Sequence, residues 1–338
     1  MKKDNMLRAE ITLGIDIGGA NTVFGYVDRK GRCLASATIP TNAHQSAELF
    51  FERLHASAEE LLETIYGKHK LVGIGIGAPN ANYYTGTIEH PPNLSWEYVN
   101  VLAEMDKYYN VPVATTNDAN AAALGEMLFG IAQGMKDFIV ITLGTGLGSG
   151  IVANGELIYG ADGNAGEIGH TVVDPNGREC GCGRRGCLET YASATGICRT
   201  VQELICNTKE PSDLRCVSFE QLTSKIVYDA AQRGDRLALE AFDYTGKILG
   251  MKLAESVAYL SPEAIILFGG LAAAGELIFK PIKQSMEEHL LAIFKNKVRL
   301  LPSGLAESNT AVLGASALIW NDLKKVRQHP LLKKVINE

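Results

Sequence analysis

Two segments of the chain repeat the same order of strands around a glycine-rich turn. Strands are expected at residues 11–17, 22–27 and 33–39 in the first segment, and at 138–143, 148–153 and 156–159 in the second. Gly18 and Gly19 form the first turn, and Gly144-Thr145-Gly146 form the second. Such internal similarity predicts a duplicated domain, in which each copy presents a glycine hairpin toward a cleft between the two.

Helical and strand patterns alternate along the rest of the chain. Helices are expected at residues 45–66, 96–109, 119–129, 192–204, 219–233, 236–260 and 311–323, and further strands at 71–76, 111–115 and 264–268. Strands interleaved with helices predict an α/β architecture.

Size and composition restrict the class of protein. The chain has 338 residues, more than a single hydrophobic core usually supports, so two lobes are expected. A hydrophobic content of 46% and a charged content of 21% are ordinary for a soluble globular protein, and a net charge of −6 argues against a nucleic-acid surface. No signal peptide or membrane-spanning stretch is expected, so we predict a cytoplasmic protein without membrane partners.

A cluster of metal-ligand residue types lies in one short stretch. His170, Cys180, Cys182 and Cys187 follow one another at spacings of ten, two and five residues. Three thiols and one imidazole are the ligands of a closed tetrahedral structural zinc site. The intervening glycines Gly181, Gly183 and Gly186 are expected to adopt conformations that other residues resist. The alternative is a group of unpaired or disulfide-bonded cysteines.

The two glycine hairpins are candidate phosphate-binding turns. Glycine lets backbone N–H groups approach phosphate oxygens, and Asp16, just before the first turn, could hold a phosphate-bound Mg²⁺ directly or through water. Neither turn is a P-loop, because no Gly-Lys-Ser/Thr follows. The alternative for either turn alone is a purely structural hairpin. The occurrence of a glycine turn in both copies favours a nucleotide site.

Asp118 is the candidate catalytic base. It follows a predicted strand and precedes a predicted helix, where a carboxylate can accept a proton from an alcohol that attacks a phosphoryl group. The alternative role for Asp118 is a helix N-cap. Amides and carboxylates that suit sugar hydroxyls accompany it, and a site built from such groups selects for a polyol. They are Asn93, Asn117, Glu167, His170 and Glu189.

These residues give the chain a resemblance to the ROK family of sugar kinases, and most to its bacterial glucokinases, within the actin, Hsp70 and hexokinase ATPase superfamily. The matching segments are residues 14–19 (GIDIGG), 73–79 (GIGIGAP), 93–96 (NLSW), 117–126 (NDANAAALGE), 143–150 (LGTGLGSG), 165–170 (AGEIGH) and 180–189 (CGCGRRGCLE). They are spread over most of the chain.

The resemblance implies a two-lobed actin-like ATPase fold of the ribonuclease H type, with duplicated α/β domains around a cleft. We expect a small lobe of residues 1–116 and 312–338, and a large lobe of residues 117–311 that carries the zinc-binding loop 170–187.

The resemblance also implies ATP-dependent phosphorylation of a hexose at its 6-hydroxyl, with glucose as the expected substrate. The cofactors would be ATP, Mg²⁺ and a structural Zn²⁺, and the protein would be a homodimer. By the resemblance, Asp118 is the general base, and the sugar ligands are Asn93, Asn117, Asp118, Glu167, His170 and Glu189. The nucleotide would contact Asp16, Gly18, Gly19, Thr145, Gly146, Gly269 and Gly270.

Two positions depart from the family pattern. Ala20 replaces the usual threonine after the first glycine pair, which removes one hydroxyl from the nucleotide turn unless Asn21 or Thr22 supplies it. Asn80 replaces a glycine near the sugar loop, and asparagine tolerates a positive φ better than most residues.

The sequence is compatible with several alternatives. The substrate could be N-acetylmannosamine, fructose, allose or N-acetylglucosamine instead of glucose, since kinases of this family for all of these sugars share the zinc motif. A non-catalytic sugar sensor of the same family is a second alternative. Only about ten residues precede the first expected strand in this sequence, too few for a helix-turn-helix, so we expect no DNA-binding role.

Overall fold

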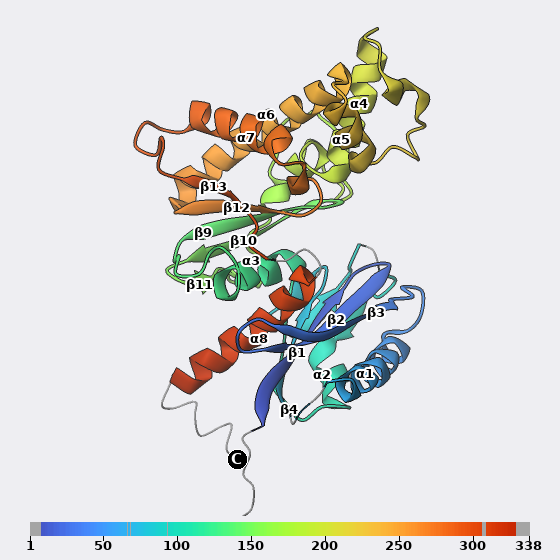
Figure 1. Ribbon diagram of the computed structural model, residues 1–338, viewed down its shortest axis with the longest axis vertical. Coiled ribbons are helices and arrows are strands. Elements are labelled where there is room, and N and C mark those ends of the chain that lie inside the picture. Colours follow the sequence, from blue (N-terminus) through green and yellow to red (C-terminus); the bar gives the residue numbers. More distant parts are fainter. Residues whose placement is uncertain (1–7, 66, 68, 93, 306–308, 329–338) are drawn as a thin grey trace, which may run out of the picture. The chain divides into compact units, whose positions relative to one another are not determined.

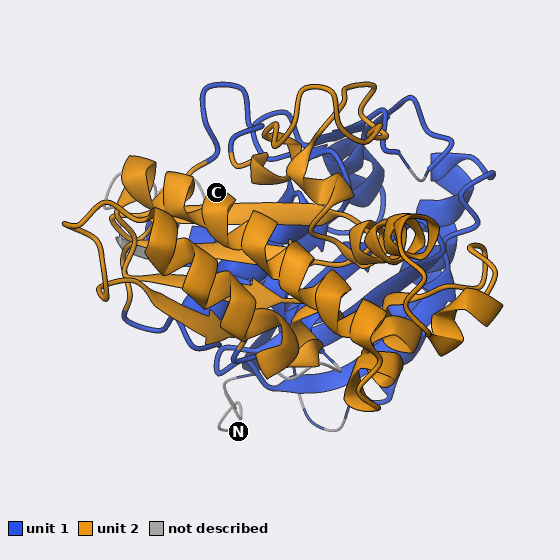
Figure 2. Ribbon diagram, turned by 90° about the horizontal axis from the view of Figure 1, so that it is seen from above, with its two compact units in different colours: residues 1–134, 159–165, 304–338 blue, residues 135–158, 166–303 orange. Residues whose placement is uncertain are grey.

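The computed structural model describes residues 8–65, 67, 69–92, 94–305 and 309–328. It divides into two compact units, which Figure 2 shows in different colours. Unit 1 comprises residues 1–134, 159–165 and 304–338, and unit 2 comprises residues 135–158 and 166–303.

Unit 1 is built on a five-stranded mixed sheet in the order β3-β2-β1-β4-β8, of which Figure 1 labels β1 to β4. The strands are β1 (Ala9–Ile17), β2 (Asn21–Asp28), β3 (Cys33–Pro40), β4 (His69–Gly77) and β8 (Val113–Thr116). β1, β2 and β3 pair antiparallel, whereas β4 runs parallel to β1 and β8 runs parallel to β4. The carboxyl ends of β1, β4 and β8 therefore lie at one edge of the sheet.

Helices cover both faces of this sheet. Along its strands, large apolar side chains on one face alternate with small residues on the other. On β1, the buried side chains of Ile11, Leu13 and Ile15 belong to a core that includes residues of α1 (Ala47–Glu63) and α2 (Val101–Asp106). The opposite face packs against α8 (Thr310–Gln328), and α3 (Asp118–Leu128) packs beside α8. A small sheet in the order β5-β6-β7 completes the unit with β5 (Ala81–Asn82), β6 (Thr87–Glu89) and β7 (Tyr98–Asn100).

Glycines allow α8 to approach the sheet closely. A Cβ atom on Gly14 of β1 would lie 2.2 Å from the carbonyl oxygen of Val312, and one on Gly75 of β4 would lie 1.9 Å from that of Ala315. Neither distance is possible for a real side chain. The helix near the end of the chain is therefore an integral layer of unit 1.

Unit 2 repeats the sheet of unit 1 strand for strand. Its order is β11-β10-β9-β12-β13, with β9 (Phe138–Leu143), β10 (Leu147–Ala153), β11 (Glu156–Leu157), β12 (Ala264–Phe268) and β13 (Arg299–Pro302). β9, β10 and β11 pair antiparallel, and β12 and β13 add in parallel to β9. The predicted duplication is visible in this shared topology.

The helices of unit 2 enclose its hydrophobic core. They are α4 (Ala194–Asn207), α5 (Ser224–Gln232), α6 (Arg236–Leu260) and α7 (Glu276–His289), and they are accompanied by the 3-10 turns η1 (Ile168–His170), η2 (Leu188–Thr190), η3 (Asp213–Cys216) and η4 (Ala272–Ala274). Buried Ile139 and Ile141 of β9 share a core with side chains of α4, α6 and α7. α6 and α7 lie side by side in Figure 1 and pack against each other.

Two helix predictions were wrong in part. Residues 96–109 contain strand β7 before α2, because Val99 pairs with Ile88 of β6 and the Asn100 side chain caps α2 by accepting from the Ala103 N–H. The helix expected at 219–233 begins at Ser224, where the Thr223 hydroxyl caps it. The predicted lobe boundaries also differ from the two units, since residues 117–134, 159–165 and 304–311 group with unit 1. Packing of α3 against α8 accounts for the first of these segments.

Within the described residues, no helix combines the length and apolar character needed to cross a membrane.

Candidate functional site

In unit 1, parallel strands bring two aspartates to one edge of the sheet. Asp16 is the penultimate residue of β1 and is paired with Gly77 of β4, which in turn pairs with Thr116 at the end of β8. Asp118 follows Thr116 by two residues as the first residue of α3. Ligand sites in open α/β sheets form at the carboxyl ends of the strands, so this edge is where such a site is expected.

Gly77 lies beside both aspartates. A Cβ atom at this position would lie 3.4 Å from Asp16 Oδ1 and 3.9 Å from the Cα atom of Asp118. The charge of Asp118 also contributes to the raised pKa of Asp16, so the two carboxylates are close enough to interact.

Asn117, and not Asp118, is the N-cap of α3. The Asn117 side-chain oxygen accepts from the Asn120 N–H at 2.7 Å, and Asp118 Oδ1 accepts from the Ala119 N–H at 2.8 Å. The capping role leaves the Asn117 amide N–H₂ as the part of that side chain that can serve a ligand. Asp118 keeps Oδ2 for a further partner.

The environment raises the pKa of both aspartates. Burial, with a contribution from the charge of Asp118, raises the pKa of Asp16 to about 7. Asp118 is open to solvent on one side, but protein atoms crowd its carboxylate, and this desolvation raises its pKa although the N–H groups of Ala119 and of Asp118 itself lower it. Raised pKa values of neighbouring carboxylates are typical of proton-transfer and cation-binding sites.

The first glycine hairpin joins β1 to β2 beside Asp16. The Gly18 N–H donates to the Asn21 carbonyl at 3.0 Å, and a Cβ atom on Gly18 would lie 2.8 Å from the same oxygen. Gly18 and Gly19 are half-buried, and Ala20 and Asn21 are exposed. The hairpin thus has an accessible tip close to a carboxylate.

In unit 2 the second hairpin occupies the equivalent place between β9 and β10. Its turn closes with the Gly144 N–H donating to the Gly146 carbonyl at 3.1 Å. Gly269 follows β12 with a φ of +103°, and a Cβ atom there would lie 2.7 Å from the carbonyl oxygen of Leu143. Thr145 and Gly146 in the turn and Gly269 and Gly270 after β12 therefore come from adjacent strand ends.

The four predicted zinc ligands converge in unit 2. The side-chain donor atoms of His170, Cys180, Cys182 and Cys187 all lie within 4.8 Å of one another. His170 Nδ1 is 3.7 Å from Cys180 Sγ, and the Sγ atoms of Cys182 and Cys187 are 3.6 Å apart. A tetrahedron with zinc–sulfur bonds of about 2.3 Å has edges of about 3.8 Å, whereas a disulfide needs about 2.05 Å. The geometry fits a zinc site and excludes a disulfide between Cys182 and Cys187.

The zinc loop favours thiolate at its exposed cysteine. Burial alone would raise the pKa of Cys182, but hydrogen bonds from the backbone and guanidinium of Arg184 and from the neighbouring cysteines lower it to about 6. Gly183 and Gly186 have φ values of +86° and +73°, as predicted. Gly181 does not have a positive φ, so the expectation for that glycine was wrong.

Glu189 connects the zinc loop to the second hairpin. Its Oε2 accepts from the Leu147 N–H at 3.1 Å, and its Oε1 lies 3.4 Å from Cys180 Sγ. A Cβ atom on Gly146 would lie 2.2 Å from Glu189 Oε2, so only glycine leaves room for this carboxylate. The predicted sugar ligand Glu189 and the predicted phosphate turn are therefore in direct contact.

Glu167 and His170 are placed by the 3-10 turn η1. Gly169 of this turn packs so closely on β10 that a Cβ atom would lie 2.1 Å from the Leu147 carbonyl oxygen. Because His170 directs Nδ1 toward the cysteines, its Nε2 atom is the one available to a ligand. Glu167, His170 and Glu189 thus gather around the start of β10.

Sequence reasoning missed Arg178, which fixes the zinc loop to α4. Its guanidinium donates to the carbonyl oxygens of Thr190 and Gly196 at 2.7 and 3.1 Å, pairs with Glu203 at 2.6 Å, and lies 4.4 Å from the centre of the Tyr191 ring. Arg178 is 8% exposed. One arginine in a charged loop gives no signal of burial in the sequence, so only the fold reveals this role.

Of the predicted site residues, Asn93 lies outside the described residues. Asp16, Gly18, Gly19, Asn117 and Asp118 lie together in unit 1, and Thr145, Gly146, Glu167, His170, Glu189, Gly269, Gly270 and the cysteines lie in unit 2. The described site residues thus fall into two groups, one in each unit.

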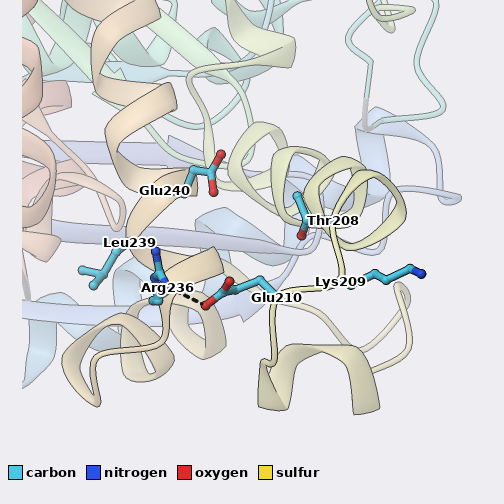
Figure 3. Close-up of a pocket in the computed structure, with 6 residues that line it drawn as sticks. All are labelled: Thr208, Lys209, Glu210, Arg236, Leu239 and Glu240. Atoms are coloured by element: carbon cyan, nitrogen blue, oxygen red, sulfur yellow. Dashed lines mark ion pairs between the residues drawn. The ribbon is translucent and has the colours of Figure 1, made fainter.

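A separate pocket of about 670 Å³ lies at the start of α6 (Figure 3). Arg236 and Glu210 form an ion pair of 3.0 Å across it. Its lining is Thr208, Lys209, Glu210, Arg236, Leu239 and Glu240. None of the predicted site residues lines it, and its charges compensate each other.

The sequence matches the ROK family over residues 12–322. The chain belongs to this family. It is 40% identical to a glucokinase from Halalkalibacterium halodurans over 82% of this chain and 86% of that protein. It is 28% identical to a xylose repressor from Bacillus subtilis over 92% of this chain and 77% of the repressor.

A solved structure extends the comparison to three dimensions. A ROK family glucokinase from Streptomyces griseus, in complex with glucose and AMPPNP, superposes with a TM-score of 0.77 at 33% identity, covering 91% of this chain and 98% of that one. The mixed α/β fold is that of ROK sugar kinases, which are actin-like ATPases.

Proposed function

We propose that this protein catalyses the ATP-dependent phosphorylation of glucose at its 6-hydroxyl to give glucose 6-phosphate. Membership of the ROK family and 40% identity to a glucokinase support the reaction class. The observation that carries the proposal is the pair Asp16 and Asp118, which lie at the carboxyl ends of the parallel strands β1 and β8, on either side of Gly77 of β4.

In this proposal Asp118 is the general base. Its free Oδ2 accepts the proton of the sugar 6-hydroxyl as the oxygen attacks the γ-phosphorus of ATP, and the bond to the β,γ-bridging oxygen breaks. Because phosphoryl transfer depends mostly on positioning and charge stabilisation, one oriented carboxylate suffices for the proton. Desolvation makes Asp118 a stronger base than a solvated aspartate, since it raises the pKa of that carboxyl.

Backbone groups and Asp16 would bind the nucleotide and its metal ion. The turns at Gly18-Gly19 and Gly144-Thr145-Gly146 offer N–H groups to phosphate oxygens, and Gly269-Gly270 lets an adenosine approach the backbone closely. Asp16 would hold Mg²⁺, directly or through water, and that ion supplies charge neutralisation to the polyphosphate when bound. Burial and the charge of Asp118 raise the pKa of Asp16, and a bound cation would stabilise the ionised form of this carboxylate.

The sugar ligands in this proposal are Asn93, the amide of Asn117, Glu167, His170 Nε2 and Glu189. His170 Nδ1, Cys180, Cys182 and Cys187 would hold the structural Zn²⁺, which fixes the tautomer and the orientation of the imidazole. The N–H group of Nε2 would then point at a sugar oxygen. A homodimer in the cytoplasm stays a prediction from the family resemblance.

A coupled assay with Mg-ATP and a panel of hexoses tests the proposal. We expect sugar-dependent ADP release with the highest kcat/KM for glucose, compared with N-acetylmannosamine, fructose, allose and N-acetylglucosamine. Higher kcat/KM for another sugar would reassign the substrate and leave the chemistry intact.

The second candidate function is sugar sensing without catalysis, which the similarity to a xylose repressor favours. A protein that binds glucose in calorimetry but releases no ADP at any sugar concentration would be such a sensor. The higher identity to a glucokinase, 40% against 28% to the repressor, argues for the kinase.

A further inference from the structure

Thr41 is hydrogen-bonded to the first glycine hairpin. It follows β3 and is fully buried, and its hydroxyl donates to the Gly18 carbonyl at 2.7 Å while its N–H donates to the Ala20 carbonyl at 2.9 Å. The Thr22 hydroxyl is 2.9 Å from that of Thr41. A carbonyl can only accept, so the single hydroxyl hydrogen of Thr41 goes to Gly18, and Thr22 is the donor to Thr41.

This bond fixes the direction of one peptide group. The described chain has no cis peptide bonds, and in a planar trans peptide the C=O and N–H point in opposite directions. With the Gly18 carbonyl directed at buried Thr41, the Gly19 N–H must point away from it. Among the described residues, the Gly19 N–H has no hydrogen-bond partner.

Arg53 of α1 in turn fixes Thr41. Its two terminal nitrogens donate to the carbonyl oxygens of Pro40 and Thr41, each at 3.1 Å. The guanidinium carbon also lies 5.9 Å from the centre of the Phe50 ring, which belongs to the core under the sheet. The hairpin is therefore connected to α1 through Arg53 and Thr41.

We propose that Thr41, braced by Arg53, is a positioning residue that turns the Gly19 N–H toward the nucleotide phosphates. The inference rests on the proposed function and adds to it. Neither residue touches the nucleotide: their effect is to preset one peptide that would otherwise rotate.

Thr41→Val tests the proposal, because it keeps the shape of the side chain and removes the hydroxyl. Calorimetry should show ADP binding weakened about five- to tenfold, the loss of one oriented hydrogen bond. Adenosine, which has no phosphate, should bind as to wild type, and the KM for glucose should change less than twofold. Thr41→Ser, which restores the hydroxyl, should recover ADP affinity.

Thr12→Val is the matched control. Thr12 is equally buried in the same sheet, and its hydroxyl contacts that of Ser316 at 2.6 Å instead of the hairpin. It should leave ADP affinity unchanged. Should Thr41→Val fail to fold, Arg53→Met is the second variant. It removes the hydrogen bonds to the Pro40 and Thr41 carbonyls and should weaken the binding of ADP but not that of adenosine.

Two results would overturn the inference: wild-type ADP affinity in folded Thr41→Val, or an equal loss of adenosine binding, which would indicate a general disturbance of the unit. A wild-type protein that binds neither ADP nor ATP would instead refute the proposed function itself.

Discussion

At the scale of single residues, the proposed function assigns the general base to Asp118. Asp118→Asn keeps the size of the side chain and its bond to the Ala119 N–H but cannot take a proton. We expect kcat to fall by about 10²- to 10⁴-fold, while the dissociation constant for glucose stays within about threefold of wild type. Asp106→Asn, at an exposed position on α2, is the control for loss of a charge.

The pH profile gives a second reading of the same residue. Because the base must be ionised, the wild-type kcat should rise with pH along an acid limb whose midpoint lies above 3.8, in the direction in which burial shifts the pKa of Asp118. Normal turnover in Asp118→Asn would contradict the assignment of the base.

Asp16 should reduce the stability of the metal-free protein at neutral and alkaline pH. Its folded pKa of about 7 exceeds the ordinary 3.8, so its contribution favours folding below pH 4 and is lost as the pH rises through 7. Asp16→Asn should therefore raise the free energy of unfolding at pH 8 in EDTA, by about 4 kcal/mol at most, and by nothing near pH 3.5. Urea unfolding at both pH values measures this difference.

Asp28 is a control of opposite sign. Burial alone would raise the pKa of Asp28, but hydrogen bonds from the backbone and guanidinium of Arg32 and from the Lys30 N–H lower it. Its contribution to stability is present above pH 4 and lost below. Asp28→Asn should hence lower the free energy of unfolding at pH 8.

The prediction for Asp16 has a clear contradicting outcome. An Asp16→Asn protein less stable than wild type at pH 8 would show that the Asp16 carboxylate is not desolvated.

At the scale of elements, the zinc loop should depend on its metal. Cys187 is fully buried, and Cys187→Ser replaces one of four ligands. We expect zinc content below one equivalent, a lower melting temperature, and glucose affinity reduced more than tenfold, because His170 and Glu189 lose their support. Metal analysis, calorimetry and glucose titration measure the three effects.

Cys206→Ser removes a thiol that is exposed and outside the cluster, so it should retain full zinc and wild-type glucose affinity. A Cys187→Ser protein that keeps one zinc and binds glucose normally would show that the cluster does not shape the sugar site.

Element positions were predictable where a local pattern decided them. The strands around both glycine turns and the metal ligands follow from alternation and spacing, which are properties of neighbouring residues. β7 was missed because its pairing with β6 is a contact between distant residues. Likewise the buried role of Arg178 depends on carbonyls of η2 and α4 that no spacing rule connects to it.

At the scale of the whole molecule, duplication was readable from the sequence but the limits of the units were not. The two sheets share one strand order, and the repeated glycine turns in the sequence predict this duplication. Unit 1, however, is assembled from three separate stretches of chain. The assignment of residues 117–134 depends on α3 packing against α8, and such packing of distant segments leaves no local signal.

The role of α8 in unit 1 leads to a test of how independent the two units are. In Gly75→Ala the new methyl group would lie 1.9 Å from the Ala315 carbonyl oxygen, so α8 must move away from β4. We expect a loss of about 2–4 kcal/mol of stability, and amide hydrogen exchange that accelerates in β1, β4 and α8 more than in β9, β10 and β12. Gly270→Ala, where a Cβ atom meets nothing within 4 Å, should leave exchange unchanged in both units. Equal acceleration in both sheets after Gly75→Ala would mean that the units unfold as one cooperative body, and a separate stability could then not be assigned to either.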